Sequence, residues 1–92
     1  MNVIQRVESL SRDQLVSGDH LLVGLKDARQ AEYIAMKLLQ ATDRLQQVLV
    51  LLHPADDTWT VHAIPCEGER TREFVDWLFA IAFRFKMDSK TL

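Results

Sequence analysis

Two apolar runs separated by a four-residue turn constrain the fold of this chain more than any other feature. Residues 46–53, QQVLVLLH, and residues 58–64, TWTVHAI, are rich in the β-branched and apolar side chains that favour strands. The sequence PADD between them is typical of a turn, because Pro54 fixes its φ angle and Asp56 and Asp57 can bond their own backbone. The pattern therefore predicts an antiparallel hairpin.

The register of this hairpin sorts its side chains into two faces. A four-residue loop places His53 opposite Thr58, and side chains then alternate between the faces. The apolar face, which must be the core face, carries Val48, Val50, Leu52, Trp59, Val61 and Ala63. The other face is mixed and carries Leu49, Leu51, His53, Thr58, Thr60, His62 and Ile64. Leu49, Leu51 and Ile64 make this mixed face a candidate surface for a partner.

Three helices and one further strand complete the predicted order. Residues 20–25, HLLVGL, form a short buried strand, and residues 28–42 form the clearest helix, with Asp27 and Gln30 resembling a capping box. Apolar residues at helical spacing predict a first helix over residues 2–16, with a break near Ser11 and a second short helix as the alternative. The last helix is predicted over residues 69–86.

The resulting order, α-β-α-β-β-α, predicts an α+β fold. The simplest sheet has three mainly antiparallel strands, with the third strand between the first and the second and the helices packed on one face. This is an incomplete ferredoxin-like sandwich, because the strand that normally follows the last helix is missing. The outer edge of residues 20–25 then lacks a neighbour, and either the N-terminal segment or a second chain covers it.

Length and charge exclude several classes of protein. We expect residues 1–92 to form a single domain. A net charge of −2 gives no basic excess that would attract nucleic acid. The one cysteine cannot form an internal disulfide, and no apolar run approaches the roughly 18 residues of a membrane span. These features predict a cytoplasmic protein that does not enter a membrane.

Cys66 and Arg72 have the Cys-x5-Arg spacing that cysteine phosphatases use to hold phosphate. However, Glu67 and Glu69 project from the same loop, and like charges about 4 Å apart cost roughly 4 kcal/mol at an effective dielectric constant near 20. We therefore predict a loop that leads into a helix, and no enzyme activity.

No cofactor or metal site is predicted. The candidate metal ligands lack the close spacing of a metal site, and they are His20, His53, His62, Asp56, Asp57 and Cys66. The mixed sheet face carries no Phe, Tyr or Trp on which a base could stack, so nucleic-acid binding is not expected either.

The last helix carries more apolar surface than one sheet can cover. Its apolar arc spans roughly 240°, whereas one-sided packing needs about 100–140°. Either the N-terminal helix covers the excess, or Trp77, Phe79 and Phe83 contact another chain. The favoured function is a non-catalytic interaction or assembly module, a homodimer that binds or modulates another protein. The alternatives are a small-ligand sensing module and, third, a phosphatase built on Cys66 and Arg72.

Overall fold

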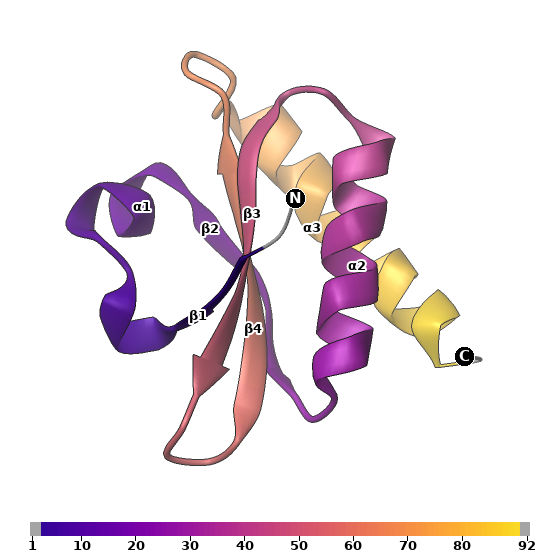
Figure 1. Cartoon of the computed structure of the whole chain (residues 1–92). Coiled ribbons are helices and arrows are strands. Elements are labelled where there is room, and N and C mark those ends of the chain that lie inside the picture. The colour runs from indigo at the N-terminus through magenta and orange to yellow at the C-terminus, as the bar shows by residue number, and fades with distance from the viewer. Residues whose placement is uncertain (1–2, 91–92) are drawn as a thin grey trace.

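A four-stranded mixed sheet separates a short N-terminal helix from two longer helices (Figure 1). The computed structural model describes residues 3–90. The elements are β1 (Val3–Arg6), the 3₁₀ helix η1 (Val7–Ser9), α1 (Arg12–Ser17), β2 (Asp19–Leu25), α2 (Ala28–Ala41), β3 (Leu45–His53), β4 (Thr58–Pro65) and α3 (Arg72–Ser89). The α+β class predicted from the sequence is confirmed.

The strands lie in the order β1-β3-β4-β2. β4 is antiparallel to both β3 and β2, so it lies between the two strands that α2 connects, as predicted. The prediction of three strands is wrong, because β1 adds a fourth strand that runs parallel to β3.

The central hairpin has the predicted register, with His53 opposite Thr58 and Leu49 opposite His62. Its turn is closed by Asp57, whose φ of 55° lies in the left-handed region. The Asp56 carboxylate accepts a hydrogen bond of 2.8 Å from the Thr58 hydroxyl, and this bond lowers the pKa of Asp56. Local turn chemistry therefore fixes the pairing of the two central strands.

The main core lies between the sheet and the two long helices. Ala31 and Ala35 of α2 are completely buried, and their small side chains let this helix approach the sheet closely. Asp27 caps α2 by accepting a hydrogen bond from the Arg29 N–H (2.9 Å). Gln30 does not complete the predicted capping box, because its side chain donates to the Ser89 hydroxyl at the end of α3 (2.8 Å).

α3 begins and ends three residues later than predicted. The Thr71 hydroxyl accepts a hydrogen bond from the Phe74 N–H (3.2 Å) and so sets the first turn. Phe74, Leu78 and Ala82 form its buried side. Within residues 3–90, none of the helices combines the length and the apolar character needed to span a bilayer.

The N-terminal segment differs most from the prediction. Val3–Arg6 is a strand and not part of a helix, because the outer edge of β3 offers a ladder of backbone hydrogen bonds to it. The alternative of a second short helix after Ser11 is confirmed. Ser11 and Gln14 form a reciprocal capping box, with hydrogen bonds of 3.1 and 2.9 Å.

This segment covers the sheet face that was predicted to be open. Leu49 and Leu51 are 0% exposed and Ile64 is 4% exposed, and Leu10 packs against the cluster that they form. We call these four residues the second core. The prediction that the helices occupy one face is therefore wrong, since α1 lies across the sheet from α2 and α3 (Figure 1).

The outer edge of β2 is the sheet margin that the N-terminal segment leaves uncovered, because β1 pairs with β3 instead. Within the described part of the chain, β4 is the strand that pairs with β2. The register of β2 shifts between His20 and Leu22 and again between Leu22 and Leu25, and Gly24 has a φ of 71°. This edge is therefore irregular.

Candidate functional site

The outward side of α3 carries exposed aromatic side chains. Trp77 is 41% exposed, Phe79 is 42% exposed and Phe83 is 58% exposed. Neither the sheet nor α2 covers these rings fully. Such exposure on a helix whose other side is buried marks a candidate interaction surface.

Two of these aromatics belong to one stripe. The side of α3 that faces α2 is identified by Phe85, whose ring lies 5.8 Å from the Lys37 ammonium. Phe83 precedes Phe85 by two residues, or about 200° around a helix, so it faces away from α2. Phe79, Phe83 and Met87 recur every four residues, and we call them the outer stripe. Because α3 packs on β2, the stripe lies on the side of the molecule that carries the unpaired edge of β2.

Trp77 belongs to a different surface, because it lies about 200° from Phe79 around the helix. Its ring stacks on Phe74, with centroids 5.7 Å apart, and the Arg44 guanidinium lies 4.1 Å from the centre of the Phe74 ring. Arg44 also pairs with Glu69. Because Trp77 stacks on Phe74, it is not part of the outer stripe. A hollow of about 260 Å³ lies beside this stack.

Cys66 and Arg72, the candidate phosphate-binding residues, lie in a loop whose described contacts are local. Arg72 has 94% of its side chain exposed, and its guanidinium lies 3.9 Å from the Asp76 carboxylate on the next turn of α3. The Cys66 N–H donates to the Arg44 carbonyl oxygen, and the Glu69 and Thr71 N–H groups bond carbonyls within the loop. These N–H groups do not converge on a common point where an anion would bind.

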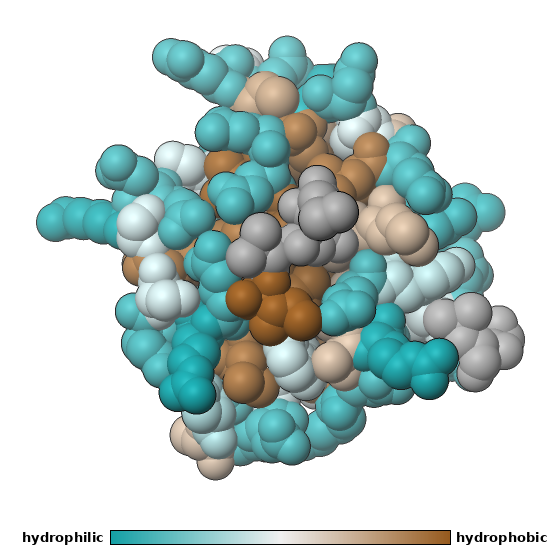
Figure 2. Space-filling view, viewed as in Figure 1, coloured by the Kyte–Doolittle hydropathy of each residue, from teal (hydrophilic) through white to brown (hydrophobic). Residues whose placement is uncertain are grey.

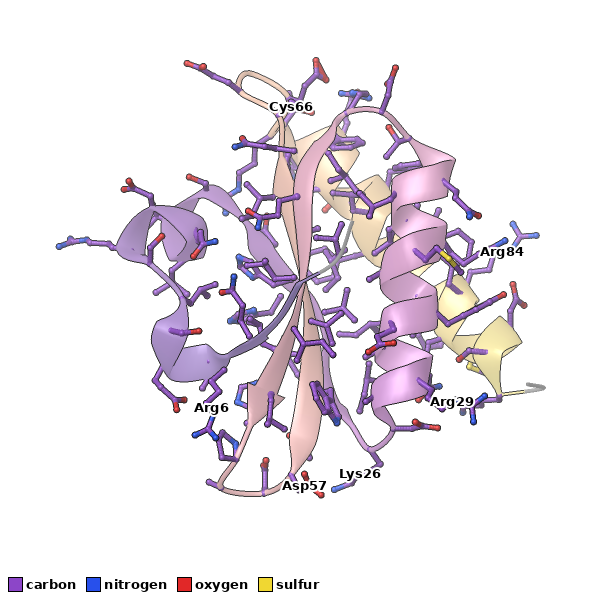
Figure 3. The ribbon with its side chains drawn as sticks, in the orientation of Figure 1. Arg6, Lys26, Arg29, Asp57, Cys66 and Arg84 are labelled. Carbon is purple, nitrogen blue, oxygen red and sulfur yellow. The ribbon has the colours of Figure 1, made fainter. Side chains whose placement is uncertain are left out.

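The candidate metal ligands do not form one cluster, although His20 and His62 lie within hydrogen-bond distance of each other. Cys66 and Asp57 lie at opposite ends of the β3–β4 hairpin (Figure 3). His53 Nε2 bonds the Thr60 hydroxyl at 2.8 Å. Among residues 3–90, no group of three His, Cys, Asp or Glu side chains is placed to hold a metal ion.

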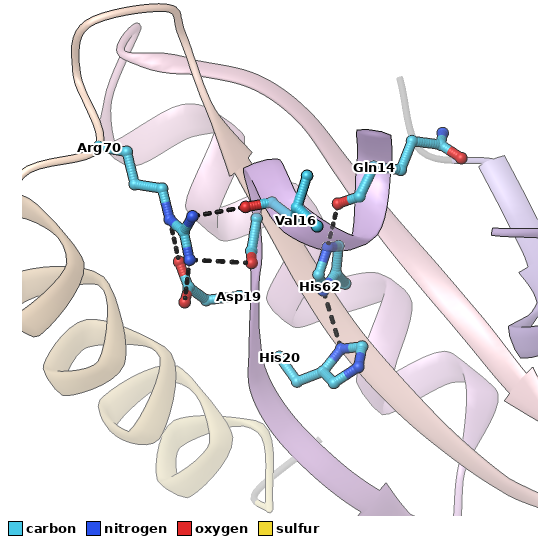
Figure 4. Close-up of polar contacts among 7 residues, drawn as sticks. Gln14, Val16, Asp19, His20, His62 and Arg70 are labelled. Atoms are coloured by element: carbon cyan, nitrogen blue, oxygen red, sulfur yellow. Dashed lines mark hydrogen bonds and ion pairs between the residues drawn. The ribbon is translucent and has the colours of Figure 1, made fainter. Parts of the chain in front are cut away.

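A cluster of polar residues connects α1 to the sheet (Figure 4). The sequence did not predict this cluster. Arg70, in the loop before α3, donates two hydrogen bonds to the Asp19 carboxylate, of 3.1 and 3.0 Å. The same guanidinium donates to the carbonyl oxygens of Val16 and Gly18 at the end of α1. The hydrogen bonds to Asp19 raise the pKa of Arg70. Arg70 therefore joins the end of α1, the start of β2 and the start of α3.

Two histidines continue this cluster under α1. His62 is 1% exposed, and its Nε2 lies 2.9 Å from the Gln14 carbonyl oxygen. Its Nδ1 lies 2.8 Å from Nδ1 of His20. A carbonyl only accepts, so His62 carries its proton on Nε2, and His20 Nδ1–H donates to His62 Nδ1. Burial, and then the neighbouring His62 and His53, lower the pKa of His20, while Asp19 acts in the opposite direction.

The pairing of His20 with His62 had a detectable signal in the sequence. Once β4 lies between β3 and β2, antiparallel pairing places His20 opposite His62 on the same face of the sheet. The role of Arg70 had no such signal, because its partners Val16, Gly18 and Asp19 lie more than 50 residues earlier in the chain.

A shallow groove of about 1030 Å³ runs along the outer side of α2. Apolar side chains gather in the middle of the face seen in Figure 2, within a mostly hydrophilic surround. The lining residues are Ile4, Asp27, Arg29, Gln30, Glu32, Tyr33, Met36, Leu39, Ser89 and Lys90.

The chain has no counterpart in the comparisons made. No protein-family model matches it, no curated protein is significantly similar to it in sequence, and no solved structure is significantly similar to it.

Proposed function

We propose that this chain is a non-catalytic interaction module that forms a homodimer through the outer stripe of α3, and that binds or modulates another protein. The observation that carries this proposal is the exposure of Phe79 and Phe83, at 42% and 58%, on a side of α3 that the rest of residues 3–90 leaves uncovered. Aromatic residues dominate the energetics of protein interfaces.

The area of the stripe fits the apolar part of an ordinary interface. An aromatic side chain buries about 150–250 Å² when covered, so Phe79 and Phe83 each offer roughly 60–150 Å² to a partner. Met87, 46% exposed, extends the same surface. A standard interface buries about 800 Å² per partner, of which about 57% is apolar. The stripe supplies a substantial share of that apolar area.

The stripe is complementary to a second copy of itself. If two α3 helices pack antiparallel about a two-fold axis, Phe79 of one copy meets Phe83 of the other. Asp76 precedes Phe79 by three residues, and Lys86 follows Phe83 by three, so the same axis places Asp76 beside Lys86 of the other copy. Antiparallel packing also opposes the two helix dipoles favourably. A second copy is therefore the occupant that this surface fits.

The dimer is tested by analytical ultracentrifugation of the wild type and of Phe79→Asp and Phe83→Asp. We expect the wild type to be a dimer and both variants to be folded monomers. Met36→Asp, which changes an equally exposed apolar side chain on α2, is the matched control and stays dimeric. A wild type that is still a monomer at roughly millimolar concentration refutes the proposal.

A charge exchange tests the geometry of the dimer. Asp76→Lys is expected to weaken the dimer by roughly 2- to 30-fold, because exposed ion pairs contribute about 0.2–1 kcal/mol each and the dimer contains two such pairs. Combining it with Lys86→Asp restores the affinity under the antiparallel arrangement. A double variant that is as weak as the two single changes together contradicts that arrangement.

The groove along α2 favours a second candidate function, a small-ligand sensing module. The groove is of the size of small-molecule sites, and it combines Tyr33, Met36 and Leu39 with charged side chains. It lies along α2 and is also lined by Ile4 of the sheet strand β1 and by Ser89 at the end of α3. A thermal-shift screen of metabolites tests this function, and Met36→Asp should abolish any shift that arises in the groove.

A further inference from the structure

We propose that residues 7–17, the lid, form an acid-released cover over the second core, and that the His20–His62 pair is the group that senses the proton. The lid comprises η1, α1 and the residues that join them. This proposal does not rest on the proposed dimer, because the lid and the outer stripe lie on opposite sides of the sheet.

The hydrogen bonds of the pair limit how many protons it can hold. In the neutral pair, one N–H points to the Gln14 carbonyl and one lies between the two Nδ1 atoms. A first extra proton can enter at Nε2 of His20, which is an exposed residue at the edge strand. A second extra proton would place two N–H groups head to head across 2.8 Å. The pair must then separate.

The surroundings of the pair oppose positive charge. His62 is 1% exposed and lies against Gly18, so water cannot reach a charge on its ring. Asp19 is the acidic group that acts on His20 from β2, but it is already bound by two nitrogens of Arg70. His53 of β3 adds to the repulsion, and the charged residues of α1, Arg12 and Asp13, are exposed. Burial accordingly lowers the pKa of His20.

The lid is the element that responds, because it is held mainly by polar contacts. None of the residues of α1 is buried, and Leu10 is the apolar residue of the lid that packs in the second core. The six-residue α1 has too few turns to be stable alone in water. α2 and α3 instead pack on the main core, to which the described lid residues do not belong. Separation of the histidines therefore releases the lid before it affects the helices.

The direction of the pH effect follows from the protons bound. In the released lid, His20 is freed from the burial and the neighbouring rings that lower its pKa from 6.5, whereas in the docked pair the contact between the two Nδ1 atoms accommodates at most one extra proton. The released state thus binds more protons, so the lid is docked above about pH 6.5 and opens as the pH falls below it. Opening should increase about tenfold per pH unit for each proton taken up. It exposes Leu49, Leu51 and Ile64.

Hydrogen–deuterium exchange on the whole chain between pH 7.5 and 5.0 tests this proposal, with rates corrected for the intrinsic effect of pH. We expect protection of the amides of residues 7–18 to fall at least tenfold across this range while the amides of α2 stay protected. Equal protection of the lid at both pH values overturns the proposal, and so does an equal loss of protection in α2, which indicates global unfolding.

Three variants assign the effect to the pair. His20→Asn keeps a donor toward His62 but removes one titrating ring, and His62→Gln keeps a donor toward the Gln14 carbonyl but does not titrate. Both should dock the lid at pH 7.5 and reduce its response to acid. His53→Gln, which changes the histidine outside the pair, should respond as the wild type does. If His62→Gln fails to fold, His20→Asn decides alone, and an unchanged acid response in that variant overturns the proposal.

Discussion

Gly18 is buried where the end of α1 meets the start of β2, and it is a glycine for reasons of space. Its φ of −134° is available to any residue. A Cβ atom at this position would lie 2.5 Å from the Ala63 carbonyl oxygen and 2.6 Å from His62 Nε2. Neither neighbour is the flexible end of a long side chain, so the backbone of α1 would have to move away from the sheet.

Gly18→Ala is therefore expected to lower the free energy of unfolding by about 1–3 kcal/mol, the usual cost of overpacking. Urea denaturation measures this change. Ser17→Ala, at the exposed neighbouring position, is the matched control and should stay within about 0.5 kcal/mol of the wild type. A Gly18→Ala variant as stable as the control would mean that α1 does not press on β4.

Arg70 and Arg72 are a second informative comparison at this scale. Arg70 binds one carboxylate through two nitrogens and reaches two carbonyl oxygens, whereas Arg72 lies 3.9 Å from one exposed carboxylate. Arg70→Lys should destabilise the chain by about 1 kcal/mol, because a lysine ammonium cannot reproduce this fork of donors. Arg72→Lys should have no measurable effect. Equal effects in urea denaturation would contradict the structural role of Arg70.

At the scale of elements, the sequence predicted what local patterns decide. The turn PADD and alternating side chains set the register of β3 and β4, and the Asp27 cap with its alanine face set α2. β1 was missed because the spacing of Val3, Ile4, Val7 and Leu10 also fits a helix. What decides its conformation is the free edge of β3, a partner about 45 residues away that no local pattern reveals.

The same error affected the predicted interaction surface. Without β1 and the lid in place, Leu49, Leu51 and Ile64 seemed to lie on an open face, whereas the exposed aromatics of α3 were identified from the width of a single helix. The sequence of one helix is enough to predict an apolar surface within that helix. It is not enough to predict that a distant segment covers a face of the sheet.

Leu51→Ala distinguishes the two kinds of surface. Leu51 is completely buried in the second core, so its truncation should cost about 2–5 kcal/mol of unfolding free energy. Leu15→Ala, at a lid position that is 52% exposed, is the control and should change little. Sedimentation of the folded Leu51→Ala chain should show the same oligomeric state as the wild type. A Leu51→Ala variant that keeps its stability but changes its oligomeric state would instead indicate that Leu51 lies in the interface.

At the scale of the whole molecule, the sheet separates the proposed lid from the proposed dimer surface. α1 lies on one face of the sheet, and α3 lies on the other (Figure 1). Each face has its own hydrophobic contacts, since the second core and the main core share no residue. A change of pH in the range where histidines titrate should therefore act on one face and leave the other unchanged.

The pH dependence of global unfolding tests this separation. Because the pKa of His20 is lowered in the folded chain, its contribution to stability is complete above pH 6.5 and is lost as the pH falls below that value. The free energy of unfolding should decrease from pH 7.5 to 5.5, and His20→Asn should flatten the profile. Sedimentation over the same range should not change. A wild type that dissociates in step with its loss of stability would show that the two faces are coupled.

The uneven edge of β2 bears on how far the proposed self-association would proceed. A straight, unpaired strand invites further strands and leads to growth without limit, as in fibres. β2 has two register shifts and a glycine with a left-handed φ angle within its seven residues. Its edge therefore does not offer a regular hydrogen-bonding pattern to the strand of another chain. Contacts through a helix related by a two-fold axis are instead satisfied once two copies have met. The edge of β2 thus disfavours polymerisation by strand addition, but it does not prevent the proposed dimer through α3.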